Sequence, residues 1–176
     1  MDFLEFLSDN GSHAVLEAKE HLFRQGEVSP KFAYVRKGIL KAYYLTYEGK
    51  EFIKSFICEG DVIGSIRSAS EKGPSPFGLL ALERCELVTF DFDCLLSAAV
   101  SDLPLARHAI ASLMQFAMKK ERREHEFLVL SPEDRYASLK LRSPELLQRV
   151  TQGDIARYLG VTPVALSRIR RRMASK

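Results

Sequence analysis

The spacing of hydrophobic residues divides this chain into a β-rich part and a helical part. Between residues 18 and 92, short hydrophobic runs follow a period of two, as at Phe32 and Tyr34 and again at Phe52 and Phe56. Turn residues, glycines above all, separate these runs at intervals of roughly ten residues. Short strands at that spacing are typical of an all-β sandwich or barrel.

A long helix is predicted from about Leu103 to Leu128. One hydrophobic stripe recurs there at alternating steps of three and four, the spacing of one helix face. It consists of Leu103, Ala106, Ile110, Leu113 and Ala117. A second stripe, made of Leu105, Ala109 and Phe116, points to another side of the helix. Two hydrophobic faces need two partners, so we expect one face to pack on the β-rich part and the other on a second subunit. A helix packed only within its own chain is the alternative.

The last 46 residues predict a small all-α unit. Ser131-Pro132 and Ser143-Pro144 each pair an N-cap serine with a proline at the first helical position. Residues 152 to 173 predict two more helices that meet at Gly160, with Thr162 capping the second. This is the pattern of a helix-turn-helix, whose second helix lies in the DNA major groove. An unrelated helical hairpin is the alternative.

The distribution of charge supports a nucleic-acid-binding tail. Residues 131 to 176 carry 10 Lys+Arg against 4 Asp+Glu, whereas residues 1 to 130 carry 16 against 19. The tail is therefore +6 and the remainder −3. Such segregation of charge suits a basic nucleic-acid-binding module attached to a domain with another function. A solvated basic helix would give the same charge difference.

The second helix of this motif carries the candidates for reading DNA. Arg168 can donate two parallel hydrogen bonds to guanine O6 and N7, and Val164 and Ala165 can contact a thymine methyl group. The neighbouring arginines suit phosphate contacts, unless they only complement the helix dipole. The residues predicted to contact DNA are Gln152, Thr162, Val164, Ala165, Ser167, Arg168, Arg171 and Arg172.

Composition excludes several other classes of protein. Three separated cysteines, Cys58, Cys85 and Cys94, lack the spacing of a zinc or iron-sulfur site, so no cofactor or metal is predicted. The N-terminus is acidic and no run of about 18 hydrophobic residues occurs, which predicts a soluble, cytoplasmic protein with no membrane partner. The four scattered histidines form no catalytic spacing, so an enzyme is not expected.

Several motifs together resemble one family of proteins. They are FAYVRKGILKAYYL, EGKEFIKSFICEGDVIGS, FGLLALERCELVTFD, SPEDRY and VTQGDIARYLGVTPVALSRIRR. In this order they resemble the Crp/Fnr family of bacterial transcription regulators, most closely its short branch.

The resemblance implies an α+β protein in three parts. A β-roll like that of cyclic-nucleotide-binding domains would occupy residues 1–101, a dimerisation helix 102–130 and a helix-turn-helix domain 131–176. It implies double-stranded DNA and a second copy of the chain as partners, and it leaves a small-molecule effector and RNA polymerase open as further partners. Only four residues follow Arg172, so we expect no β-hairpin wing.

The chain departs from the family where a cyclic nucleotide would bind. The family's Gly-Glu and Arg-Ser pairs, which meet the ribose and the phosphate, correspond to Gly64-Ser65 and Ser75-Pro76. Both charged contacts are missing, so we expect no binding of cAMP or cGMP. A different ligand would use Gly64, Ser65, Ile66, Arg67, Ser75 and Phe77, although Arg67 also suits a plain surface loop. The alternative function is a small-ligand sensor or protein-interaction module whose tail no longer binds DNA.

Overall fold

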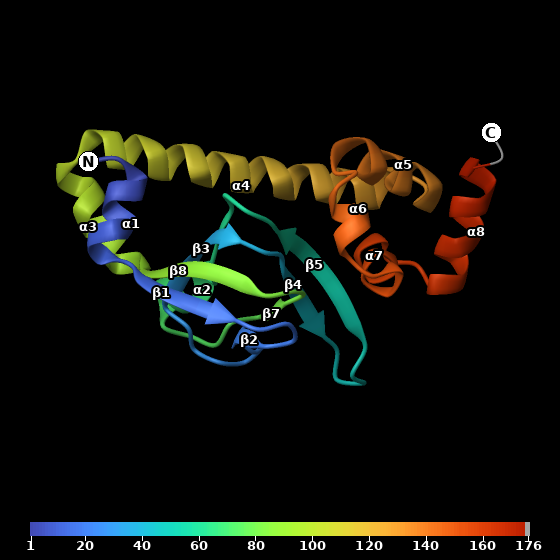
Figure 1. Cartoon of the computed structure of the whole chain (residues 1–176), viewed down its shortest axis with the longest axis horizontal. Helices are drawn as coiled ribbons and strands as arrows, with labels where there is room; N and C mark the ends of the chain where they lie inside the picture. The colour runs from blue at the N-terminus through green and yellow to red at the C-terminus, as the bar shows by residue number, and fades with distance from the viewer. Residues whose placement is uncertain (175–176) are drawn as a thin grey trace.

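The computed structural model describes residues 1–174 and contains two four-stranded antiparallel sheets that form a β-roll (Figure 1). One sheet has the strand order β1-β8-β3-β6 and the other β2-β7-β4-β5. The strands are β1 (Ser12–Leu16), β2 (His21–Phe23), β3 (Lys31–Lys37), β4 (Leu40–Leu45), β5 (Glu51–Ile57), β6 (Val62–Ile63), β7 (Gly78–Ala81) and β8 (Cys85–Asp91). The predicted fold class is confirmed.

The core of the roll lies between the two sheets, where the inward residues of each strand meet. Val35, Leu40, Leu79 and Leu87 are almost fully buried there. The turn from β3 to β4 needs Gly38, whose φ is +97°. A Cβ atom at this glycine would lie 2.7 Å from the Cys85 sulfur at the start of β8. The close approach of this turn to β8 therefore excludes any larger residue.

Three helices that the hydrophobic pattern did not predict border the roll. They are α1 (Phe3–Asn10), α2 (Ile66–Glu71) and α3 (Phe92–Ser101), and β1 lies wholly before the β-rich part predicted from residue 18. Each of them has a side-chain cap, which for α2 is Ser65. Asp2 and Glu5 form a capping box on α1, and Asp91 accepts hydrogen bonds from the first turn of α3. These short helices pack on β8 through Phe6 and Leu95.

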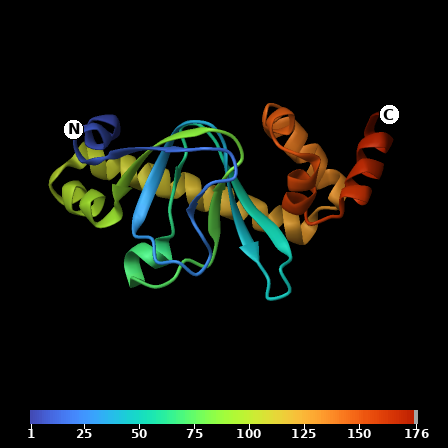
Figure 2. The ribbon, with the colours of Figure 1, turned by 60° about the horizontal axis from the view of Figure 1, so that its bottom comes forward.

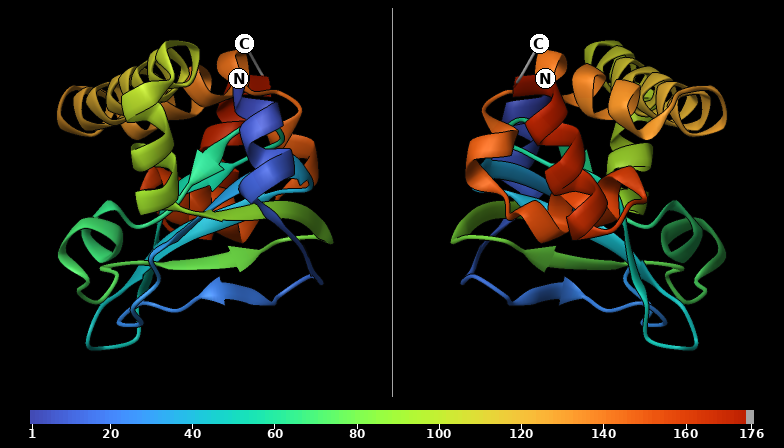
Figure 3. Two further views of the ribbon diagram at one scale, coloured as in Figure 1. Left: turned by 90° about the vertical axis from the view of Figure 1, so that its left-hand side faces the viewer. Right: turned by 90° about the vertical axis from the view of Figure 1, so that its right-hand side faces the viewer.

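Helix α4 (Leu103–Val129) confirms the predicted long helix almost to the residue. In Figure 1 it runs along the roll, with α1 and α3 at one end and the C-terminal helices at the other. The views in Figure 3 place α2 on the same side of the roll as α4. No helix within residues 1–174 is long and hydrophobic enough to cross a membrane.

The C-terminal part contains α5 (Pro132–Arg142), α6 (Leu146–Arg149), α7 (Gln152–Leu159) and α8 (Pro163–Ala174). Ser131 caps α5 as predicted, accepting a hydrogen bond from the Asp134 N–H. The prediction that Ser143 and Pro144 begin the next helix is wrong. Ser143 instead ends α5 by donating its N–H to the Leu139 carbonyl, and α6 begins at Leu146 without a side-chain cap.

The C-terminal helices dock on the β-roll through α7, which packs against β5 (Figure 2). A buried ion pair lies at this contact: the Lys41 ammonium is 3.2 Å from Asp154 and 2.7 Å from Glu51. At the edge of the contact, Arg149 binds Glu59 and Glu83. The first of these bonds holds the pKa of Glu59 down at about 2.

Candidate nucleic-acid interface and ligand pocket

The predicted helix-turn-helix forms from α7 and α8. Thr151 caps α7 by accepting from the Asp154 N–H at 3.1 Å. Gly160 ends that helix with φ at +71°, a conformation that favours glycine. The Ala165 N–H then donates to the Thr162 hydroxyl at 3.2 Å, which confirms Thr162 as the cap of α8. The two helices therefore meet where the sequence placed the turn.

Helix α8 has one buried face and one exposed face. Leu166 and Ile169 are buried against α5 and α7. Because residues three and four apart share a face of a helix, Val164, Ser167, Arg168 and Arg171 lie on the opposite side, where all four are exposed. Figure 1 shows α8 at the end of the molecule, away from the β-roll. Ala165 is half-buried beside this face, and Gln152 and Thr162 are exposed at the starts of α7 and α8.

The arginines of α8 differ in their partners. Arg172 forms an ion pair with Glu133 at 3.0 Å. Within residues 1–174, Arg168 has no hydrogen-bonding or ion-pair partner, and it projects from the exposed face at the middle of the helix. An exposed guanidinium without an internal partner is free to make two hydrogen bonds to a planar acceptor.

The predicted ligand residues do not meet in one cavity. Ser65 is buried as the cap of α2, and its hydroxyl accepts from the Ser68 N–H. Ser75 is also buried, with its hydroxyl donating to the Phe77 carbonyl. Arg67 points to solvent and pairs with Glu71 at 3.1 Å. The predicted cassette therefore provides no inward cation of its own.

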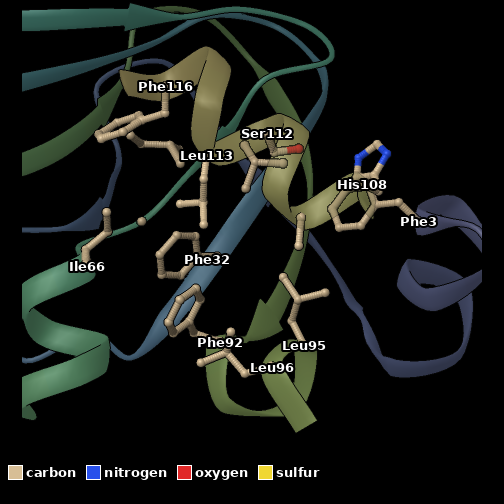
Figure 4. Close-up of a pocket in the computed structure, with 14 residues that line it drawn as sticks. Phe3, Phe32, Ile66, Phe92, Leu95, Leu96, His108, Ser112, Leu113 and Phe116 are labelled. Atoms are coloured by element: carbon tan, nitrogen blue, oxygen red, sulfur yellow. The ribbon is translucent and has the colours of Figure 1, made fainter. Parts of the chain in front are cut away.

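A small apolar cavity lies between α4 and the roll (Figure 4). Its volume is about 80 Å³, and Gly64 and Ile66 are the only predicted ligand residues on its wall. The other lining residues are mostly aromatic or aliphatic and include Phe32, Phe92, Leu113 and Phe116. Pockets that hold drug-sized ligands have volumes of roughly 300–1,000 Å³, so this cavity suits only a much smaller group.

The two stripes of α4 have different environments. Leu105 is fully buried and Phe116 half-buried against the roll. Residues of the other stripe remain largely exposed, with exposed fractions of 61% at Ile110 and 50% at Leu113. Met114 and Met118 extend this exposed face. A hydrophobic face of this size has no partner within residues 1–174.

Sequence reasoning missed three half-buried cations on and around α4. Arg123 donates to the Ile53 and Tyr158 carbonyls at 2.9 and 2.8 Å, and burial lowers its pKa. It thereby links β5, α4 and α7. Lys54 of β5 and Lys120 of α4 lie together over aromatic rings. The only sequence signal was a lysine inside the hydrophobic run EFIKSFI.

Comparison with known proteins agrees with this architecture. Residues 14–102, half of the chain, match the cyclic nucleotide-binding domain family. The chain is 27% identical to the anaerobic regulatory protein of Haemophilus influenzae and 28% identical to the fumarate and nitrate reduction regulatory protein of Yersinia pestis. Each alignment covers 88% of this chain, and 63% and 65% of the relative. The chain thus spans somewhat less than two thirds of their length.

Solved structures show the same fold. The structure of FixK2 from Bradyrhizobium japonicum superposes with a TM-score of 0.80 at 21% identity, over 94% of this chain and 85% of that one. The likeness covers the β-roll, the long helix and the C-terminal helices together. The chain belongs to the Crp/Fnr family of transcription regulators.

Proposed function

We propose that the chain is a dimeric regulator that binds specific sites on double-stranded DNA through α8. The observation that carries this proposal is the exposed face of α8, where Arg168 has no partner within residues 1–174. Residues 131–176 form the DNA-binding domain in this proposal, 102–130 the dimerisation helix and 1–101 the effector domain.

In the proposed complex the exposed face of α8 enters the major groove. Arg168 then binds a guanine through O6 and N7, while Val164 and Ala165 lie against a thymine methyl group. Gln152 and Thr162, at the starts of α7 and α8, are placed for phosphate contacts together with Ser167, Arg171 and Arg172. Arg172 must exchange its ion pair with Glu133 to do so, which lowers its expected contribution.

Dimerisation through α4 follows from its exposed hydrophobic face. Ile110, Leu113, Met114 and Met118 leave half or more of each residue's surface in water. Packing this face on the same helix of a second copy removes it from solvent and generates two-fold symmetry. Two copies of α8 are then presented together, so one dimer holds two DNA half-sites.

We also propose that the effector domain does not bind cAMP or cGMP. Ser65 and Ser75 are buried and already hydrogen-bonded, and Arg67 faces solvent. No cation of the predicted cassette is available to offset the desolvation of a cyclic phosphate. The cavity of about 80 Å³ that Gly64 and Ile66 line is also too small for a nucleotide without rearrangement.

The proposed function is tested by fluorescence anisotropy with labelled duplexes at several salt concentrations. Lys and Arg contacts to phosphate release counterions, so affinity for DNA should fall steeply as salt rises. The expected result is binding that weakens by roughly a hundredfold or more between 50 and 200 mM salt. Binding that is absent at 50 mM salt, or independent of salt, would instead support a sensor or protein-interaction module without DNA-binding activity.

A further inference from the structure

A β-bulge makes Lys54 the extra residue of its strand. Across the β4–β5 pair, Ala42 lies opposite Ser55 and Tyr43 lies opposite Ile53. Lys54 therefore has no partner opposite it in the sheet. Bulges change the direction of a side chain and are enriched beside functional sites. The side chain of Lys54 departs from the alternation of the strand in this way and reaches α4.

The Lys54 ammonium lies over aromatic rings and against a second lysine. Its nitrogen is 3.9 Å from the centroid of the Phe77 ring and 5.7 Å from that of Phe116. Lys120 of α4 lies 5.0 Å from the same Phe116 ring and contacts the Lys54 side chain. Within residues 1–174, neither lysine forms an ion pair with a carboxylate. Two half-buried lysines from different elements therefore touch without a counterion.

Such a pair favours one neutral amine. Two touching ammonium groups repel each other, and the ring faces around them carry no formal negative charge to offset the repulsion. Burial, and then the charge of Lys120, accordingly lower the pKa of Lys54 to about 7. At pH 8 roughly 90% of Lys54 is neutral, against roughly 0.4% of an ordinary lysine side chain.

A neutral lysine amine beside a second cation is activated as a nucleophile toward an electrophilic carbon. With CO2, the nitrogen lone pair forms an N–C bond while one C=O π bond of CO2 breaks, which leaves its electron pair on oxygen. The nitrogen then releases one proton to the solvent, and the product is a carbamate anion. Lys54 would thus carry a negative charge in contact with the Lys120 ammonium, so a charge-assisted hydrogen bond would replace the contact between two amines.

The surroundings of Lys54 favour CO2 over other electrophiles. The side chain is half-buried, which keeps a lysine-modifying enzyme away from its nitrogen but admits a molecule as small as CO2. Ser55, Phe116 and Lys120, which adjoin Lys54, line an open groove of about 770 Å³ through which CO2 can enter. An aldehyde would form an imine, which carries no negative charge and leaves Lys120 without a counterion. The carbamate is therefore the product that suits this pair of lysines.

We infer that CO2 carbamylates Lys54 and that the Lys120 ammonium binds the resulting carbamate. The reaction joins β5 to α4 by an ion pair, so the contact between the roll and the long helix becomes stronger as CO2 rises. The site is separate from the apolar cavity in Figure 4, whose wall contains neither lysine. The inference is independent of the proposed function, because it concerns a covalent change of the chain without DNA.

Carbon-13 NMR of the full chain with labelled bicarbonate at pH 8 detects the carbamate directly. We expect a carbamate resonance in the wild type at about 50 mM bicarbonate and the loss of this resonance in Lys54→Met. Lys50→Met is the matched control, because Lys50 is an exposed lysine at the turn before β5, and it should keep the resonance. Lys120→Met should reduce the carbamate roughly tenfold or more, whereas Lys120→Arg retains a cation and should keep most of it.

Chemical trapping locates the modification without any substitution. Triethyloxonium ion esterifies a carbamate, and peptide mapping of the wild type by mass spectrometry then identifies the modified amine. We expect the ethyl ester on Lys54 and not on Lys50. The melting temperature should also rise with sodium bicarbonate in the wild type but not in Lys54→Met, with sodium chloride of equal ionic strength as the salt control.

Three results would overturn the inference. They are no carbamate resonance in the wild type at this bicarbonate concentration, an unchanged resonance in Lys54→Met, and trapped ester on exposed lysines but not on Lys54. DNA affinity is measured separately by anisotropy. A protein that binds DNA but forms no carbamate would refute this site alone, whereas one that forms the carbamate but does not bind DNA would refute the proposed function alone.

Discussion

The buried ion pair between the β-roll and α7 gives a sharp prediction about how the C-terminal helices are held on the roll. The side chains of Lys41 and Asp154 are only 9% and 8% exposed, and their charged atoms are 3.2 Å apart. Asp154→Asn removes the negative charge with little change of shape. Breaking a buried pair from one side costs about 3–5 kcal/mol, because the other charge stays buried. In this variant Lys41 retains its ion pair with Glu51 at 2.7 Å. We therefore expect the free energy of unfolding to fall by an amount near the lower limit, about 3 kcal/mol.

Urea unfolding followed by circular dichroism measures this loss. Asp134→Asn is a matched control, because Asp134 has the same position after the cap of α5 as Asp154 has in α7, yet it is exposed and, within residues 1–174, forms no ion pair with a lysine. It should cost less than about 1 kcal/mol. The double variant Lys41→Met with Asp154→Leu should recover most of the stability, since hydrophobic residues often replace a buried pair without loss.

Two outcomes would refute this reasoning. A cost below about 1 kcal/mol for Asp154→Asn would mean that the charge does not hold α7 on the roll. A double variant as unstable as the single one would mean that the loss comes from altered packing rather than from an unpaired ammonium group.

Four further predictions concern DNA binding, assembly, the ligand and pH. Arg168→Ala should remove roughly 1–3 kcal/mol of discrimination between target and random DNA, whereas Arg170→Ala should weaken both alike; equal losses in both variants would refute base reading. Ile110→Glu with Leu113→Glu should give monomers in sedimentation, and a monomeric wild type at micromolar concentration would reject the α4 dimer. Titration with cAMP should give no saturable heat, and a dissociation constant below about 10 μM would contradict this expectation. The pKa of Lys54 is lowered from 10.5 to about 7, so the unfolded chain binds more protons between these values and unfolding free energy should rise with pH there. Lys54→Met should flatten that rise.

Features that depend on residues close together in the sequence were predicted well. The Thr162 cap, the turn at Gly160 and the extent of α4 depend on neighbouring residues or on a regular hydrophobic repeat, and the structure agrees with each. Ser143-Pro144 shows the limit of local signals. The same serine suits either the end of one helix or the start of the next, and in the structure its N–H ends α5 by donating to the Leu139 carbonyl.

Features that depend on distant residues could not be predicted. Lys41 and Asp154 are 113 positions apart, and each alone resembles an ordinary surface charge. The bulge at Lys54 depends on the register between β4 and β5, which no pattern within one strand reveals. Sequence could identify Ser65 and Ser75 as departures from the family, but only the structure placed Lys54 and Lys120 over the same Phe116 ring.

Selection of bound sequences from a randomised duplex library tests the central claim most directly. A dimer that presents two copies of α8 should enrich an inverted repeat with half-sites about one helical turn apart, and each half-site should contain a guanine that Arg168→Ala no longer selects. Enrichment of a single unsymmetrical site would contradict the symmetric dimer. No enrichment over the starting library would contradict the assignment of the chain as a sequence-specific DNA-binding regulator.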